Sequence, residues 1–181
     1  MSGVSTEPLP RFRYYRDPVG DATIEPSEAV CAACERSRGF IVTSTAYGTD
    51  VPEDARFCPW CVAAGVAHQR YGVTFNEVDR GATAEATAEV RVRTPGFLSW
   101  QDWDWPTHCD DVCVYLGQPT GEELRGNREA YDALLADIRQ WDWGRDEEYV
   151  RDFIDGLGGS HVAYLFQCSR CEKQLVRWDA D

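Results

Sequence analysis

The sequence CPWC, residues 58–61, contains two cysteines separated by two residues. This spacing serves either a thiol–disulfide redox centre or one half of a metal site. The rest of the chain distinguishes these two uses, because its eight cysteines fall into four pairs and three of the pairs are C-x2-C. A redox centre needs one such pair and gives no reason for the others. The pattern therefore favours zinc, which takes four ligands in a structural site and would use the eight cysteines in two sites.

The first expected site combines two C-x2-C pairs: Cys31, Cys34, Cys58 and Cys61. The segment between the pairs is longer than the ~15–20 residues of common zinc ribbons. A strand predicted at residues 39–48, which are rich in β-branched and aromatic side chains, accounts for the extra length. In this interpretation Pro59 stiffens the turn between the cysteines and Trp60 shields the metal lobe from water.

The remaining cysteines form the second expected site: Cys109, Cys113, Cys168 and Cys171. Cys168 and Cys171 lie between two predicted strands, at residues 161–168 and 173–178, which is the usual arrangement of a zinc knuckle. The C-x3-C spacing of the other pair places both sulfurs on one face if that segment is helical. His108 is an alternative ligand, and a site of three cysteines and one histidine would then release one cysteine of that pair.

The chain mixes predicted strands with predicted helices at residues 62–72, 79–90, 122–141 and 149–157, and a short helix that Thr107 would cap. The helix at 122–141 has the clearest apolar stripe: Tyr131, Leu134, Leu135, Ile138 and Trp141. The expected fold class is α+β, a single domain at residues 31–181 with two zinc-knuckle or ribbon-like lobes and C-terminal helices packed on short antiparallel strands. Residues 1–30 contain four prolines and are expected to form an extended arm packed on this domain.

The charge balance limits the possible partners. Asp and Glu number 31 against 18 Lys and Arg, which gives a net charge of −13. Nucleic acids and anionic membranes both select positive surfaces, so neither is an expected partner. The sequence contains no apolar stretch near the ~20 residues of a membrane span and no apolar run after its first basic residues. These features predict a cytoplasmic protein, in which cysteines stay reduced.

Three tryptophans are crowded between residues 100 and 105: Trp100, Trp103 and Trp105. Base stacking on these rings is disfavoured, because no basic residues are interleaved with them. We expect them to fill the core between the two metal lobes and to leave some exposed face for a protein partner.

Five segments in order along the chain carry a resemblance to a known family: LPRFRYYRDP at 9–18, CPWC at 58–61, RTPGFLSWQ at 93–101, HCDDVCVYLG at 108–117 and AYLFQCSRC at 163–171. With them the chain resembles the CbrC family of small bacterial cysteine-rich proteins, which is linked by name to colicin tolerance. The resemblance implies a cytoplasmic location and metal binding, and it implies no particular activity.

Three functions are compatible with these observations. The first is a protein-interaction module with two structural zinc ions. The second is a metalloenzyme with an open zinc site at His108, Cys109, Cys168 and Cys171. The third is a thiol redox sensor that releases zinc on oxidation. No catalytic residue is assigned, because Asp110 and Asp111 beside His108 are expected to be solvent-facing acids at a helix start rather than general bases.

Overall fold

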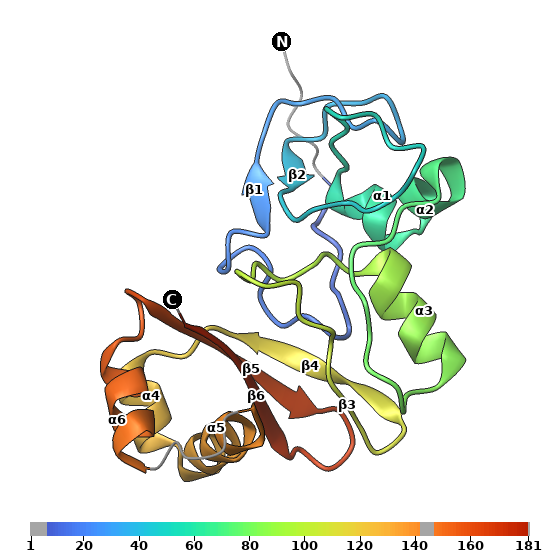
Figure 1. Cartoon of the computed structure of the whole chain (residues 1–181). Coiled ribbons are helices and arrows are strands. Elements are labelled where there is room, and N and C mark those ends of the chain that lie inside the picture. Colours follow the sequence, from blue (N-terminus) through green and yellow to red (C-terminus); the bar gives the residue numbers. More distant parts are fainter. Residues whose placement is uncertain (1–6, 142–146, 181) are drawn as a thin grey trace.

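A four-stranded antiparallel sheet lies at the centre of the computed structural model, which describes residues 7–141 and 147–180 (Figure 1). Its strands follow one another in chain order: β3 (Thr107–His108), β4 (Asp111–Gly117), β5 (His161–Cys168) and β6 (Gln174–Ala180). The predicted strand at residues 161–168 coincides with β5. The strand predicted at residues 173–178 corresponds to β6, which extends two residues further.

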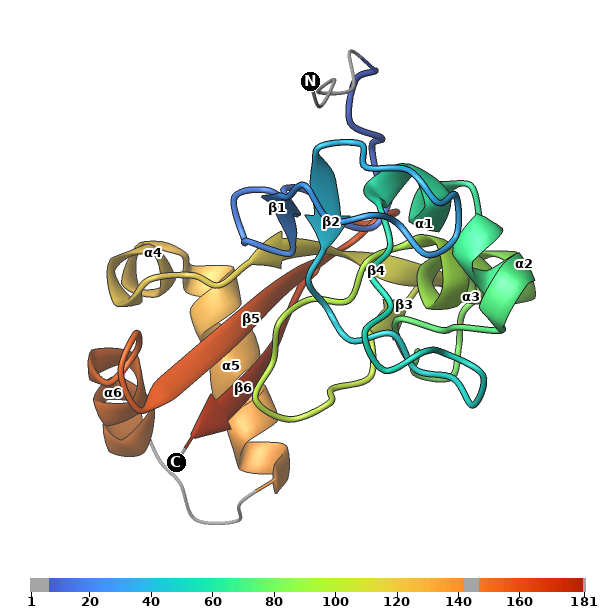
Figure 2. The same cartoon turned by 90° about the horizontal axis from the view of Figure 1, so that it is seen from above.

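Both faces of this sheet are covered, and β5 shows why. Side chains alternate across a strand, so Tyr164 and Phe166 enter one hydrophobic core while Ala163 and Leu165 enter another. Helices α4 (Gly121–Gly126), α5 (Arg128–Trp141) and α6 (Glu147–Asp155) cover one face, and the N-terminal half of the chain covers the other (Figures 1 and 2).

The C-terminal helices pack their apolar stripes on β5 and β6, as the sequence predicted. Leu134 and Ile138 of α5 are completely buried. The side chain of Trp141, the last residue of the predicted stripe, lies outside the described residues. The single helix predicted at 122–141 is divided at Asn127, whose side-chain oxygen accepts a hydrogen bond from the backbone amide of Ala130 at 3.2 Å and begins α5.

The N-terminal half contains β1 (Ile24–Pro26), β2 (Phe40–Val42), α1 (Pro59–Ala63), α2 (Val66–Tyr71) and α3 (Ala84–Arg93). β1 and β2 form a separate antiparallel pair, so the strand predicted at residues 39–48 is much shorter than expected. The helix predicted at residues 62–72 is two short helices, because the chain turns at Gly65, which has φ 74° and is the N-cap of α2.

Aromatic rings fill the core on the N-terminal side of the sheet. Trp105 is completely buried, and its indole N–H donates to the backbone oxygen of Cys113 at 2.7 Å. Phe97 contacts four other rings at centroid distances of 4.8–5.4 Å: Trp105, Tyr115, Tyr164 and Phe166. Each such ring pair stabilises the fold by about 0.5–1.5 kcal/mol beyond the free energy gained by burying the area of the rings. Trp105 thus holds the loop before β3 against β4 and β5.

The short helix expected after Thr107 is wrong, because this segment is a β-hairpin. Thr107 pairs with Val112 and His108 with Asp111, which leaves a two-residue turn. The turn residues Cys109 and Asp110 have φ values of 53° and 58°, the left-handed pair that a type I′ hairpin turn requires. The β-branched and aromatic residues Val112, Val114 and Tyr115 favour this strand over a helix.

The predicted fold class is confirmed: the described residues form one α+β domain with cysteine-rich lobes and C-terminal helices on antiparallel strands. No described helix combines the length and the apolar character that a membrane crossing needs.

Candidate metal centres

The first cysteine group lies in the N-terminal half, between the loop before β2 and the start of α1. It contains the predicted residues Cys31, Cys34, Cys58 and Cys61, whose sulfur atoms all lie within 4.8 Å of one another. Cys31 and Cys58 are completely inaccessible, and Cys61 is 5% exposed. The group is therefore enclosed by protein and positioned to bind a metal ion.

Hydrogen bonds favour the thiolate form of one sulfur in this group, that of Cys31. The N–H of Cys58 donates to the sulfur of Cys31 at 3.2 Å, and the N–H of Glu35 closes the turn onto the carbonyl of Cys31 at 2.7 Å. Hydrogen bonds from the Cys58 side chain and from nearby backbone amides lower the pKa of Cys31 to about 4, although burial alone would raise it. Deprotonated sulfur is the form that binds metals.

Pro59 and Trp60 hold the second half of this group. Cys58 is the N-cap of α1 and Pro59 is its first residue, where a proline costs no backbone hydrogen bond. The Trp60 indole donates to the carbonyl of Pro8 at 3.0 Å, and the guanidinium of Arg38 lies 4.2 Å from its ring centre. Cys58 at a helix start also fits a redox dithiol, but its sulfur lies 4.0 Å from that of Cys34, in a group of four.

The second group joins the β3–β4 hairpin to the turn between β5 and β6. It contains His108, Cys109, Cys168 and Cys171, whose ligand atoms also lie within 4.8 Å of one another. The sulfurs of Cys109 and Cys171 are 3.6 Å apart, and Nδ1 of His108 lies 3.1 Å from the first and 3.3 Å from the second. Cys109 and Cys171 are exposed, so this group opens to solvent where the first does not.

The knuckle that carries Cys168 resembles the one that carries Cys31. The N–H of Glu172 donates to the carbonyl of Cys168 at 3.1 Å, and Glu172 has φ 62°. Burial alone would raise the pKa of Cys168, but hydrogen bonds from the backbone of Cys171 and Arg170 outweigh it and lower the pKa to about 6. This sulfur is thus prepared as a thiolate.

Cys113 lies outside this group, and His108 is in it. Because the segment is a hairpin, Cys113 sits in strand β4, paired in register with Cys168. It is completely inaccessible, and burial raises the pKa of its thiol to about 12. A buried neutral thiol packs as a small apolar side chain. The helical spacing argument for Cys109 and Cys113 fails here because it assumed a helix.

Both groups have the dimensions of a tetrahedral metal site. With metal–sulfur bonds of about 2.3 Å, the sulfurs of a tetrahedron are about 3.8 Å apart. The sulfur–sulfur distances of 4.0 Å in the first group and 3.6 Å in the second match this value. They are much longer than a disulfide bond of about 2.05 Å, and all eight cysteines are free thiols. Two groups of four donors are therefore positioned to bind a metal ion each.

A buried carboxylate, that of Asp111, lies next to the second group. Sequence reasoning missed this residue, because it placed Asp111 in solvent. Its side chain is 4% exposed. One carboxylate oxygen accepts from the Tyr14 hydroxyl at 2.7 Å and the other from the Ser169 hydroxyl at 2.7 Å and from Arg13 at 3.0 Å. Burial alone would raise its pKa, but the hydrogen bonds from Ser169 and Tyr14 outweigh it and hold the pKa below the ordinary value.

Asp111 therefore connects the N-terminal segment, the hairpin and the Cys168 knuckle. The pattern of apolar residues at 112–115 was the available signal, since it places Asp111 at the first position of a strand rather than on an exposed helix.

The three tryptophans expected to fill the core and to leave some face for a partner have different environments. Trp105 is completely buried and Trp103 is partly buried. Trp100 is 51% exposed, beside Leu98 at 43%. The loop that carries them is tied to β6 by buried Asp179, which accepts from the Trp103 indole at 2.7 Å and from the backbone N–H of Trp100 at 3.0 Å. Of the three rings, Trp100 offers the most surface.

The model of an uncharacterised protein family, UPF0167, matches residues 9–180. The chain belongs to this family. The UPF0167 proteins Mb2317 of Mycobacterium bovis and MT2352 of Mycobacterium tuberculosis are each 37% identical to it over 177 residues, with 94% of this chain and 93% of the relative covered. The UPF0167 protein PA1536 of Pseudomonas aeruginosa is 33% identical over 169 residues, with 91% of this chain and 93% of the relative covered. No solved structure matches the chain.

Proposed function

We propose that this UPF0167 protein is a zinc protein with two structural zinc ions and that it acts by docking another protein. The observation that carries the proposal is the pair of four-donor groups, one of four cysteines and one of three cysteines and a histidine. Soft thiolate donors in a tetrahedron select zinc or iron–sulfur clusters, and imidazole also suits zinc. Structural zinc sites use these same donor sets.

A structural role is favoured over catalysis because each group supplies four ligand atoms. A catalytic zinc keeps one position for water or substrate and so has three protein ligands. The second group is complete without Cys113, since His108 provides its fourth donor. The metalloenzyme hypothesis therefore has no open position to support it.

A protein partner is proposed from the exposed apolar residues Leu98 and Trp100 and from the net charge of −13, which favours a basic surface over nucleic acid or an anionic membrane. The proposal places the protein in the cytoplasm, where its thiols stay reduced for metal binding. A link to colicin tolerance is also part of the proposal. It rests on the resemblance of the quoted sequence segments to the CbrC family.

Elemental analysis tests the metal content directly. Protein purified without added metal should contain about two zinc ions per chain, one for each four-donor group. Less than one metal ion per chain, or iron in place of zinc, contradicts the proposal.

A matched pair of variants tests the ligand assignment in the same measurement. Cys109→Ser should lose about one zinc per chain, whereas Cys113→Ser should keep both, because only Cys109 belongs to the second group. The opposite pattern would reassign the site to Cys113.

A redox sensor is a second candidate function, favoured by the exposure of Cys109 and Cys171 and by their sulfur–sulfur distance of 3.6 Å. One thiolate attacks hydrogen peroxide and becomes a sulfenic acid with release of hydroxide. The second thiolate attacks that sulfur and displaces a second hydroxide, which forms the disulfide. A metal ion held by this group would then have two ligands fewer.

Peroxide treatment should then reduce the zinc content from about two ions to about one per chain and yield a Cys109–Cys171 disulfide in peptide mass spectra. The enclosed first group should keep its zinc. Equal loss from both groups, or zinc loss without this disulfide, would count against the sensor.

A further inference from the structure

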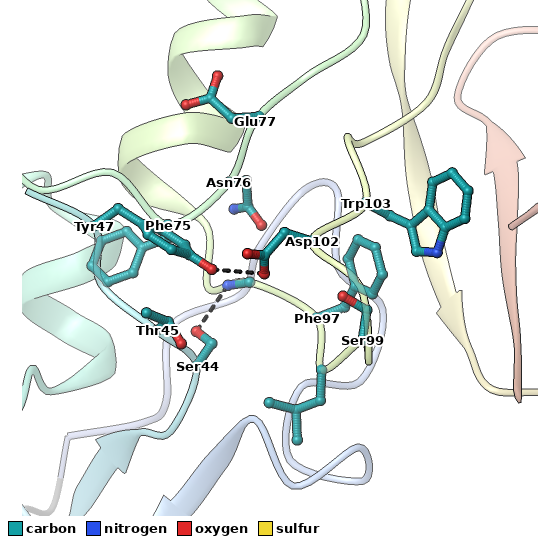
Figure 3. A pocket seen from close by; sticks show the side chains of 12 residues that line it. Ser44, Thr45, Tyr47, Phe75, Asn76, Glu77, Phe97, Ser99, Asp102 and Trp103 are labelled. Carbon is teal, nitrogen blue, oxygen red and sulfur yellow. Dashed lines mark hydrogen bonds between the residues drawn. The ribbon is translucent and has the colours of Figure 1, made fainter. Parts of the chain in front are cut away.

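A pocket without cysteine or histidine lies between three loops of the N-terminal half (Figure 3). Its volume is about 300 Å³, at the lower end of the range for small-ligand sites. Four aromatic side chains line it: Tyr47, Phe75, Phe97 and Trp103. Its polar lining includes Ser44, Asn76, Glu77 and Asp102.

Asn76 presents a fixed hydrogen-bond acceptor to this pocket. The residue is 9% exposed, and its amide nitrogen donates to the carbonyls of Val90 at 2.8 Å and Thr94 at 2.9 Å. These two bonds determine which end of the amide faces the pocket. A Cβ atom added at Gly96, on the opposite loop, would lie 3.3 Å from the Asn76 oxygen. Among the described residues, no group donates a hydrogen bond to that oxygen.

The charged side chains that line the pocket, Glu77 and Asp102, are both negative. Asp102 is exposed and accepts a hydrogen bond from the Tyr47 hydroxyl at 2.8 Å, as Figure 3 shows. Glu77 pairs with Arg91 at 2.9 Å, so the Asp102 carboxylate is the charge left for a ligand. In Figure 3 the Asn76 amide and the Asp102 carboxylate face the same part of the pocket. No lysine or arginine occurs among the lining residues that the structure describes.

We propose that this pocket binds the ammonium or guanidinium group of an organic cation. The acceptor oxygens of Asn76 and Asp102 match the donors of such a group, and aromatic faces attract a cation through their quadrupole. The net charge of −13 also raises the local concentration of cations. The inference stands on the pocket alone and does not depend on the two metal ions.

One charged and one neutral compound of the same shape test the inference on the full-length protein as purified. N-butylguanidinium should bind and shift the indole N–H resonance of Trp103, whereas N-butylurea, which has the same shape without the charge, should bind at least about tenfold more weakly. Equal binding of the two compounds, or no shift with either at millimolar concentration, overturns the inference.

Substitutions locate the binding site. Asp102→Asn keeps the shape and an acceptor for Tyr47 but removes the charge, so the affinity for N-butylguanidinium should fall about tenfold. Glu28→Gln makes the same change of net charge at an exposed residue outside the pocket and should leave the affinity unchanged. An equal loss in both variants would show general charge attraction and refute a site at the pocket. Unchanged affinity in Asp102→Asn would refute it as well.

The same titration separates the two sources of such a cation. A blocked Gly-Arg-Gly tripeptide presents the guanidinium as a side chain of a protein segment. Binding at least about tenfold tighter than N-butylguanidinium supports a basic side chain of a protein partner, and weaker binding supports a free small molecule. Both results support cation binding. If neither probe binds, the inference is overturned, and the zinc content, which is measured separately, still tests the proposed function.

Discussion

Replacing Cys58 with serine should remove about one zinc ion per chain and loosen the N-terminal lobe around α1 and β2. The expected effect is large, because structural zinc contributes about 10 kcal/mol or more in isolated finger peptides. That is comparable to the whole stability of a typical domain, about 5–15 kcal/mol. The substitution also removes the Cys58 thiol, whose side-chain hydrogen bond helps to lower the pKa of Cys31, while the backbone N–H of residue 58 can still donate to the Cys31 sulfur.

The C-terminal helices should survive this substitution. Leu134 and Ile138 of α5 and Phe153 of α6 belong to a hydrophobic cluster separate from the one that contains Cys58. Hydrogen exchange measured by mass spectrometry should therefore show lost protection in α1 and β2 and retained protection in α5 and β6.

Cys113→Ser is the matched control, since it makes the same exchange of sulfur for oxygen at a buried cysteine outside both groups. It should keep both metal ions. If the wild type instead reduces insulin disulfides and Cys58→Ser keeps its full zinc content, Cys58 and Cys61 form a redox centre and the metal assignment is wrong.

Asp111→Asn should lower the free energy of unfolding by about 3 kcal/mol, and the melting temperature by roughly 6–12 °C for a domain of this size. An amide cannot accept from Tyr14, Ser169, Arg13 and the amide of Val112 together, because one end of it is a donor. Thermal unfolding measures the expected loss of stability. Competition with a zinc chelator measures a second expected effect, weaker retention of a metal ion in the second group.

The effect should depend on pH in a defined direction. The pKa of Asp111 is lower in the folded protein, so its contribution is complete above the ordinary aspartate pKa of ~4 and is lost as the pH falls below it. The difference between wild type and variant should shrink over that range.

Asp110→Asn is the control, because it changes the neighbouring exposed carboxylate and asparagine also tolerates the left-handed conformation found there. It should cost less than about 0.5 kcal/mol. Equal destabilisation by the two substitutions would assign the effect to the turn and not to the buried carboxylate.

The cysteine spacing predicted much of the candidate site because ligand pairs are local in sequence. Cys31 with Cys34, Cys58 with Cys61 and Cys168 with Cys171 each occupy a short turn, so their proximity needs no tertiary information. The strand at residues 161–168 and the helix face with Leu134 and Ile138 were likewise visible as periodic apolar patterns.

The partner of the Cys168 knuckle was ambiguous because the hairpin and a helix place residues 108–113 differently. In a helix Cys109 and Cys113 share a face, whereas in the hairpin the turn carries Cys109 and the strand carries Cys113 into the core. Asp111 and the pocket at Asn76 depend on residues far apart in sequence, such as Tyr14 and Ser169 around the carboxylate. A single sequence contains no periodic signal for such contacts.

The two metal groups close chain segments of different length, and this sets the order in which they can assemble during synthesis. Cys34 and Cys58 are 24 positions apart, whereas Cys109 and Cys171 are 62 positions apart. The entropic difference between these closures is small, about 0.8 kcal/mol. The order of synthesis matters more than this entropic difference. The first group is complete once residue 61 has left the ribosome, whereas the second is complete only after residue 171 has been made. Until then, His108 and Cys109 lack the other two donors of their group, Cys168 and Cys171, so this candidate metal site is still incomplete.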